Sequence, residues 1–367
     1  MNINKVSTIE AIALILILTI NRLSISLPQD IILSCGSSSI LNVIYISIIA
    51  IIFTIIIVKL FKRFAGSDIV DVSSFLGGKV LRNIVGIFLI LYIISISSLL
   101  LRYFSETLKV LYYFDTPVIY ILLFFIGVCI ISNIFGGHSI IKTNLIVCII
   151  MLIGLIISFL SVTPNMTIQR ALPILGYGAD KTFFYGLTNL IAFNGLLILY
   201  LVPPMLSNKK DFKKVAIISI IITAILIVFA VGSVLLAFSF STEIDKISSL
   251  YMLLSNNVFG KYLQHPESLF SFTWVLSFMS YINIACMLCI QLVKKVTNVK
   301  NGKPLIIPIS LIIFALALLP KNLVYAHQIE YSLYTFVSIP LLFIILPAIL
   351  IFANRKYKKI HRNNYDV

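Results

Sequence analysis

Residues 19–30 read Thr19-Ile20-Asn21-Arg22-Leu23-Ser24-Ile25-Ser26-Leu27-Pro28-Gln29-Asp30, and this stretch decides the fold because it interrupts an apolar segment. Residues 9–20 before it are almost entirely apolar, which is typical of a membrane helix. A proline disfavours helical geometry in the residue that precedes it. Free backbone groups in a bilayer cost several kcal/mol unless protein or a wet cavity surrounds them. We therefore interpret the stretch as a helix broken at a binding site. The alternative is a helix that ends near Ile20 and leads into a polar surface loop.

The composition is that of an integral membrane protein. The chain has 367 residues, of which 60% are hydrophobic and 11% charged, and its mean hydropathy is +1.09. A soluble domain carries about 25% charged residues, and a membrane helix needs about 20 apolar residues. We expect an all-α membrane domain with ten transmembrane helices, at about residues 7–33, 40–61, 83–104, 117–135, 143–162, 183–205, 214–240, 268–292, 304–320 and 333–353.

The positions of the basic residues predict the orientation. A net charge of +15 would suggest nucleic acid as the partner of a soluble protein. With the N-terminus in the cytoplasm, however, twenty Lys and Arg residues fall on the cytoplasmic side and seven outside. Such an excess marks cytoplasmic loops. We therefore expect both termini in the cytoplasm, no nucleic-acid partner, and a basic tail, residues 354–367, that contacts anionic lipid headgroups of the bilayer.

A second interruption is predicted in the sixth span. Phe193-Asn194-Gly195 lies near its middle, and Pro203-Pro204 closes it. Interrupted segments at corresponding places in two halves are a pointer to a midplane binding site in an inverted-repeat transporter. We therefore predict one membrane domain over residues 1–367, built as a five-plus-five inverted repeat with helices 1 and 6 broken. The first repeat covers about residues 7–162 and the second about 183–353.

The predicted ligand site combines these breaks with polar residues expected at mid-depth. Its candidate residues are Asn21, Ser24, Ser26, Tyr92, Ser95, Phe193, Asn194, Gly195, Tyr281 and Asn283. A ligand carboxylate could meet free backbone N–H groups at the first break. A ligand ammonium would rely on dipoles, because we expect no acid at mid-depth. Packing is the alternative role for Tyr92, and hydrogen bonding between helices is the alternative for Asn283.

Four further features have simple structural interpretations. Ser67 is expected to cap a short helix at the cytoplasmic face, which Gly77-Gly78 would end. Arg102 and Glu106 have the spacing of a surface ion pair. His138 is expected at the membrane interface, with a proton relay as the alternative. The C-x-x-C of Cys286 and Cys289 is assigned to packing, since a zinc site needs four ligands. We expect no metal and no cofactor.

Several short motifs, taken in order along nearly the whole chain, resemble one family. They are Ser24-Ile25-Ser26-Leu27-Pro28, Ala65-Gly66-Ser67-Asp68-Ile69-Val70, Leu76-Gly77-Gly78-Lys79, Leu101-Arg102-Tyr103-Phe104-Ser105-Glu106, Thr116-Pro117, Leu172-Pro173-Ile174-Leu175 with Gly178, Pro203, and Pro266-Glu267-Ser268-Leu269-Phe270 leading to Trp274. The ordered set resembles the B subunit of the nutrient germinant receptors of spore-forming bacteria. That family is the spore germination branch of the amino acid–polyamine–organocation (APC) superfamily.

The resemblance implies a ten-helix APC-like fold in the spore inner membrane. It also implies a small germinant, often an amino acid, bound around broken helices 1 and 6. The implied partners are the A and C subunits of a germinant receptor complex, the former a membrane protein with large soluble domains and the latter a lipoprotein. Two positions depart from the family: His265 replaces a frequent arginine before the eighth span, and Phe193-Asn194-Gly195 lacks a frequent glutamate. Both departures weaken the expectation of an acidic ammonium site.

The favoured function is therefore that of a germinant-sensing protein within a receptor, and the alternative is a secondary active transporter of amino acids or related solutes. Proton coupling usually needs buried acids. The acids of the outer half are expected near span ends or in external loops: Asp30, Glu106, Asp115, Glu243, Asp245, Glu267 and Glu330. This placement argues against proton-driven transport. An enzyme is the third class, and no grouping of His, Cys and acidic residues in the sequence supports it.

Overall fold

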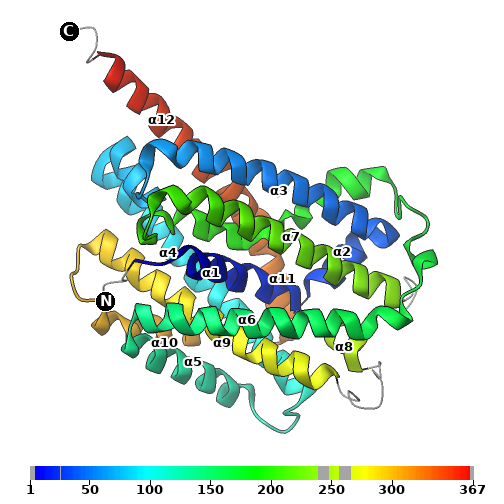
Figure 1. Ribbon diagram of the computed structural model, residues 1–367. Coiled ribbons are helices and arrows are strands. Elements are labelled where there is room, and N and C mark those ends of the chain that lie inside the picture. Colours follow the sequence, from blue (N-terminus) through cyan, green and yellow to red (C-terminus); the bar gives the residue numbers. More distant parts are fainter. Residues whose placement is uncertain (1–4, 25, 239–247, 256–265, 364–367) are drawn as a thin grey trace.

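The computed structural model describes residues 5–24, 26–238, 248–255 and 266–363, and within these ranges every regular element is a helix (Figure 1). Eight helical segments there are long and apolar enough to cross a membrane. This confirms the all-α membrane class. The count of ten spans, the division into two repeats and their inverted relation stay predictions. The predicted His265 position lies outside the described residues.

Twelve α-helices lie within the described residues. Their bounds are α1 (Thr8–Ile20), α2 (Leu27–Cys35), α3 (Ser39–Phe61), α4 (Ile69–Leu111), α5 (Val118–Phe135), α6 (Gly137–Val162), α7 (Phe212–Ala237), α8 (Ser249–Ser255), α9 (Pro266–Thr297), α10 (Ile306–Ala317), α11 (Leu323–Leu333) and α12 (Leu346–Asn363). Four irregular helical segments matter for the site: η1 (Asn21–Ser24), η6 (Asp180–Phe184), η7 (Tyr185–Tyr200) and η11 (Tyr334–Ser338).

The first helix is broken where the sequence predicts. α1 ends at Ile20, the 3-10 turn η1 follows, and α2 begins at Leu27 with Pro28 in its first turn. Asn21 and Arg22 are 2% and 5% exposed. Because both side chains are buried inside the protein, the alternative of a polar surface loop after Ile20 is wrong.

The second interruption is also present. The 3-10 helix η7 contains a non-helical residue, Phe193, with φ −101° and ψ 21°. Asn194 and Gly195 follow it directly, as predicted. A 3-10 helix of 16 residues is itself unusual, since runs longer than three or four residues are uncommon. The sixth span therefore has irregular winding beside the first break.

The interrupted helix α1 is the centre of the bundle. It contacts α6, α7, α9 and η7, and in Figure 1 it lies between α6 and α7. Peripheral helices instead leave apolar stripes uncovered. On α3, Ile48, Ile52 and Ile55 are each about half exposed and recur at three- and four-residue spacing. Such a stripe fits contact with lipid.

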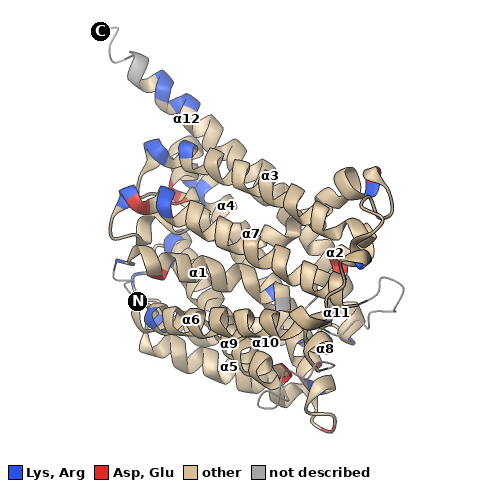
Figure 2. Cartoon of the chain, turned by 45° about the vertical axis from the view of Figure 1, so that its right-hand side comes forward, with Lys and Arg blue, Asp and Glu red and all other residues tan. Residues whose placement is uncertain are grey.

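Basic residues gather at one end of the bundle. Figure 2 shows most Lys and Arg residues at the end that carries the N-terminus and the tail of α12. This agrees with the charge distribution that predicts a cytoplasmic face. The orientation of the chain in a membrane stays a prediction.

The start of α4 corrects one sequence expectation. The cap is Asp68 rather than Ser67: the Asp68 side chain accepts a hydrogen bond from the Asp71 backbone N–H at 2.9 Å. Lys295 of α9 approaches both carboxylates, at 2.5 Å and 2.6 Å. Burial raises the pKa of the Asp68 carboxyl above its usual value, although Lys295 opposes this rise. The predicted interruption at Gly77 and Gly78 is confirmed, with Gly78 at φ +68°.

Arg102 and Glu106 form the predicted i, i+4 ion pair, with 2.7 Å between Arg102 Nη2 and Glu106 Oε1. The two side chains are 9% and 15% exposed, so the pair is not on the surface. Both residues belong to α4, which packs against α9 and α11. The interpretation as a surface pair is therefore wrong.

Substitutions at Asp68 test the cap. Asp68→Ala should lower the stability of the purified protein by about 1 kcal/mol or more, because it removes both the N-cap acceptor and one of the two carboxylate partners of Lys295. Asp68→Asn keeps an acceptor and should lose less. Thermal unfolding in detergent measures both, with the exposed Asp115→Ala as the control. Equal melting temperatures for Asp68→Ala and the control would show that the cap contributes nothing.

Candidate functional site

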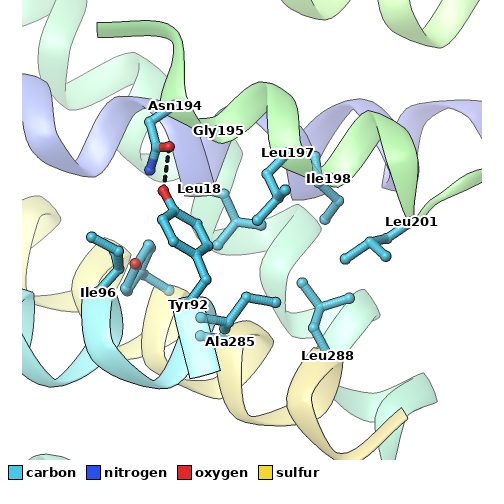
Figure 3. Close-up of a pocket in the computed structure, with 12 residues that line it drawn as sticks. Leu18, Tyr92, Ile96, Asn194, Gly195, Leu197, Ile198, Leu201, Ala285 and Leu288 are labelled. Carbon is cyan, nitrogen blue, oxygen red and sulfur yellow. Dashed lines mark hydrogen bonds between the residues drawn. The ribbon is translucent and has the colours of Figure 1, made fainter. Parts of the chain in front are cut away.

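A small cavity lies between the two interrupted helices, α4 and α9, and we call it the central cavity (Figure 3). Its volume is about 50 Å³. A water molecule needs roughly 10–15 Å³ of such space, so the cavity holds a few waters at most in this state. Its lining residues are Leu18, Tyr92, Ile93, Ile96, Asn194, Gly195, Leu197, Ile198, Leu201, Tyr281, Ala285 and Leu288.

The two breaks meet directly beside this cavity. A Cβ atom added to Gly195 would lie 2.7 Å from Thr19 Cα and 2.8 Å from Thr19 Cβ, and closer still to the Thr19 hydroxyl. Real Cβ atoms essentially never come this close to other heavy atoms. Glycine at position 195 therefore allows η7 to approach the end of α1. Thr19 itself donates a hydrogen bond to the Ile15 carbonyl at 2.6 Å.

Tyr92 connects three elements at the cavity wall. Its hydroxyl donates to Asn194 Oδ1 at 2.6 Å and lies 2.5 Å from the Ser338 hydroxyl. Figure 3 shows the Tyr92 ring pointing from α4 toward Asn194. Since Ser338 belongs to η11, these hydrogen bonds link α4, η7 and η11. The structure thus brings together Tyr92, Asn194, Gly195 and Tyr281 of the predicted site residues.

Other predicted residues lie away from the cavity lining. Asn21 donates to the carbonyls of Ile17 and Ser277, at 2.8 Å and 3.2 Å, and joins α1 to α9. Phe193 is fully buried in packing, and Ser95 is half-buried. The backbone of Ser24 belongs to η1, but its side chain lies outside the described part of the chain.

Asn283 points in a different direction from the rest of the predicted site. Its amide donates to the Ser132 hydroxyl of α5 at 3.2 Å. It lines a separate cavity of about 240 Å³ with Ser132, Ser139, Thr143 and Ser280 among its neighbours. The alternative role, hydrogen bonding between helices, describes its contacts here.

A buried charge cluster beside the first break is absent from the predicted site. Arg22 Nη2 lies 3.4 Å from Asp30 Oδ2, and Arg22 Nε lies 3.3 Å from Glu330 Oε1. His327 Nε2 is 3.2 Å from Asp30 Oδ1. The Tyr334 ring covers the Arg22 guanidinium, with 4.2 Å between its centroid and Cζ.

This cluster shows how two of the acids expected near span ends or in loops are packed. Glu330 is 1% exposed and the Asp30 side chain 10% exposed, and both lie on helices, so they are enclosed by protein. Their depth in a membrane stays a prediction. Glu330 lies about 10 Å along α11 from its first residue, at 1.5 Å per residue. A signal was available in the sequence: Arg22 at a helix break needs buried carboxylate partners. Sequence spacing alone could not say which acids supply them.

Asp30 and His327 also line a second cavity, which we call the outer cavity. Its volume is about 220 Å³. Ser26, another predicted site residue, lies in its wall and donates to Asp30 Oδ2 at 3.1 Å. The complete lining is Ser26, Gln29, Asp30, Leu33, Tyr103, Leu323, Val324, His327 and Gln328. Ser26 is thus close to the first break but belongs to a different cavity from Tyr92.

The cysteines and His138 form no metal site within the described residues. Cys286 and Cys289 are fully buried along α9. His138 is half-buried near the start of α6. Within residues 5–24, 26–238, 248–255 and 266–363, no group of three His, Cys, Asp or Glu side chains has the arrangement of a metal site.

Comparison with known proteins gives one family. A family model described as spore germination protein matches residues 5–326. No curated protein matches the chain. The match includes both interrupted helices and every residue that lines the central cavity. It ends just before His327 and Glu330, which complete the charge cluster.

Substitution of Gly195 tests the close approach of the two breaks. Gly195→Ala should destabilise the protein by about 1–3 kcal/mol, because overpacking forces neighbouring backbone to move. The matched control is Gly127→Ala in α5, where an added Cβ meets no atom within 4 Å. Thermal unfolding in detergent compares the two. A Gly195→Ala melting temperature as high as that of Gly127→Ala would contradict the described contact.

Proposed function

This chain belongs to the spore germination protein family, and from that premise we propose that it is the solute-sensing B subunit of a spore nutrient receptor. The family describes a germination-related, permease-like membrane protein. The proposal adds that the protein binds a small solute, such as an amino acid, and that binding triggers germination. The proposed location is the spore inner membrane with both termini in the cytoplasm. The proposed partners are the A and C subunits of the receptor.

One observation carries this proposal: the two interrupted helices meet at a small cavity with polar groups in its wall. Thr19 and Gly195 fix the meeting point, and Tyr92 and Asn194 supply the polar groups. Non-helical backbone at membrane depth is tolerated where it is buried in protein or lines a cavity. Discontinuous helices at such a position form the substrate site in inverted-repeat transporters.

The small volume of the central cavity supports sensing through a change of shape. At about 50 Å³ it must widen before an amino acid enters. Widening between α4 and η7 separates Tyr92 from Asn194, since both residues line the cavity and are hydrogen-bonded to each other. A ligand that prefers the widened state shifts the equilibrium toward it. Movement of η11 then passes to α12 and the cytoplasmic tail, which we propose as the route to the partner proteins.

A ligand screen tests the proposal. The purified protein is heated in detergent with single amino acids, nucleosides or sugars, and a ligand of the native state must raise its melting temperature. We expect at least one such ligand, and we expect Asn194→Leu to abolish its effect by removing the partner of Tyr92. The lipid-facing Ile55→Leu should retain it. A ligand whose effect survives Asn194→Leu does not bind in the central cavity, and this outcome would contradict the proposed site.

The second candidate function is secondary active transport, and the charge cluster favours it. Glu330 is buried and Asp30 and His327 are partly buried beside a broken helix, and ionisable groups in such places mark proton pathways in transporters. Uptake of the identified ligand into liposomes, with and without a proton gradient, separates the two functions. Binding without uptake supports the sensor, whereas gradient-driven uptake supports the transporter.

A further inference from the structure

The outer cavity is walled by three helices that come from distant parts of the sequence. The start of α2 supplies Ser26, Gln29 and Asp30, α4 supplies Tyr103, and α11 supplies His327 and Gln328. Its volume of about 220 Å³ is below the 300–1,000 Å³ of pockets for drug-sized ligands. The space therefore suits a solute of a few heavy atoms. Leu33, Leu323 and Val324 add apolar side chains to this otherwise polar lining.

The side chains beside this cavity carry more negative than positive charge. Two carboxylates, Asp30 and Glu330, share the one guanidinium of Arg22. Arg22 is 5% exposed, lies under the Tyr334 ring and does not line the cavity. A second positive charge is therefore needed to balance the pair of acids. His327 supplies it when protonated, because its Nε2 lies 3.2 Å from Asp30 Oδ1.

We propose that the outer cavity binds the ammonium group of a small organic amine, with the Asp30 carboxylate as its counter-ion. The ammonium takes the position that the His327 imidazolium otherwise occupies against Asp30. The inference goes beyond the proposed function, since it requires nothing of the central cavity. The bound amine and the protonated imidazole are alternatives, so binding of the amine displaces the charge of His327.

The other polar groups of the wall fit an ammonium rather than an anion. An ammonium has three N–H donors and no acceptor. Asp30 offers carboxylate oxygens, and the Ser26 hydroxyl lies 3.1 Å from that carboxylate. Tyr103 presents a ring whose centroid is 5.5 Å from that of His327, and aromatic faces attract cations at such distances. An anion in the cavity would be repelled by the Asp30 carboxylate, and it could not reach Arg22, which is buried and does not line the cavity.

The ionisable groups around His327 come from five elements. Asp30 approaches from α2, Arg22 from η1, Tyr103 from α4 and Tyr334 from η11, while Glu330 and Tyr331 belong to α11 itself. The His327 imidazole nitrogens lie 3.2 Å from Asp30 Oδ1 and 3.8 Å from Glu330 Oε2. The centroid of its ring lies 5.5 Å from that of Tyr103 and 6.5 Å from that of Tyr331. Arg22 is therefore the one fixed cation within this described cluster.

The test uses three probes of nearly equal size. Calorimetric titration of the full-length protein in detergent at one pH and salt concentration compares n-propylammonium, propionamide and propionate. We expect binding of n-propylammonium alone. Asp30→Asn should weaken it by more than about tenfold, because truncation of a buried charge pair is costly. His327→Gln should tighten it by removing the competing cation, and His327→Lys should abolish it by placing a permanent ammonium against Asp30.

Two comparisons keep the result decisive. The lipid-facing Ile55→Leu should leave n-propylammonium binding unchanged. Failure of the outer site shows as loss of n-propylammonium binding, whereas failure of the central cavity shows as the absence of any ligand whose effect depends on Asn194, so the two are distinguishable. The melting temperature of each variant shows whether it is folded. If Asp30→Asn does not fold, the binding measured for His327→Lys tests the proposal instead. Binding of propionamide as tight as that of n-propylammonium, undiminished binding in folded His327→Lys, or no binding of the amine would each overturn the proposal.

Discussion

A buried guanidinium at a break in a membrane helix has to be neutralised, and much of this structure depends on how that is done. Arg22 lies in η1, where α1 has ended and α2 has not begun. Removing one partner from a buried ion pair typically costs about 3–5 kcal/mol. Asp30 and Glu330 must therefore stay beside it, which holds α2 and α11 together over the break. The last third of the chain is in this way bound to the first thirty residues.

The segment η11 connects this cluster to the central cavity. Its first residue, Tyr334, covers Arg22, and its last, Ser338, lies against the Tyr92 hydroxyl. The segment has π-helical geometry, which occurs frequently at functional sites. Charge at the outer cavity and shape at the central cavity thus act on the same short piece of chain. A change at either place has a direct physical route to the other.

The sequence predicts the parts of this structure that depend on local chemistry. Pro28 with its polar neighbours marks the first break, Asn194-Gly195 marks the second, and Gly77-Gly78 marks the kink in α4. The expected cap of α4 is wrong by one residue because Ser67 and Asp68 are both good N-cap residues. The family is confirmed, and the predicted ligand site itself stays a prediction.

What could not be predicted depends on contacts between distant residues. Arg22 and Glu330 are about 300 positions apart, and no local pattern pairs them. Asn283 is expected in the site because it lies in the same span as Tyr281. Two positions along a helix correspond to a rotation of about 200°, so the two side chains point to different neighbours. The direction of a polar side chain around a helix needs the packing of all its neighbours.

The contact between Thr19 and Gly195 has a mechanical consequence. Because there is no room for even a methyl group there, α1 and η7 cannot slide past each other without first separating. Both also contact α7, and η7 and α7 contact α3. These four elements therefore pack against one another around the contact between the two interrupted helices. We therefore expect an opening of the protein to keep Thr19 and Gly195 together and to change the packing of α1 and η7 against α4 and α9 instead.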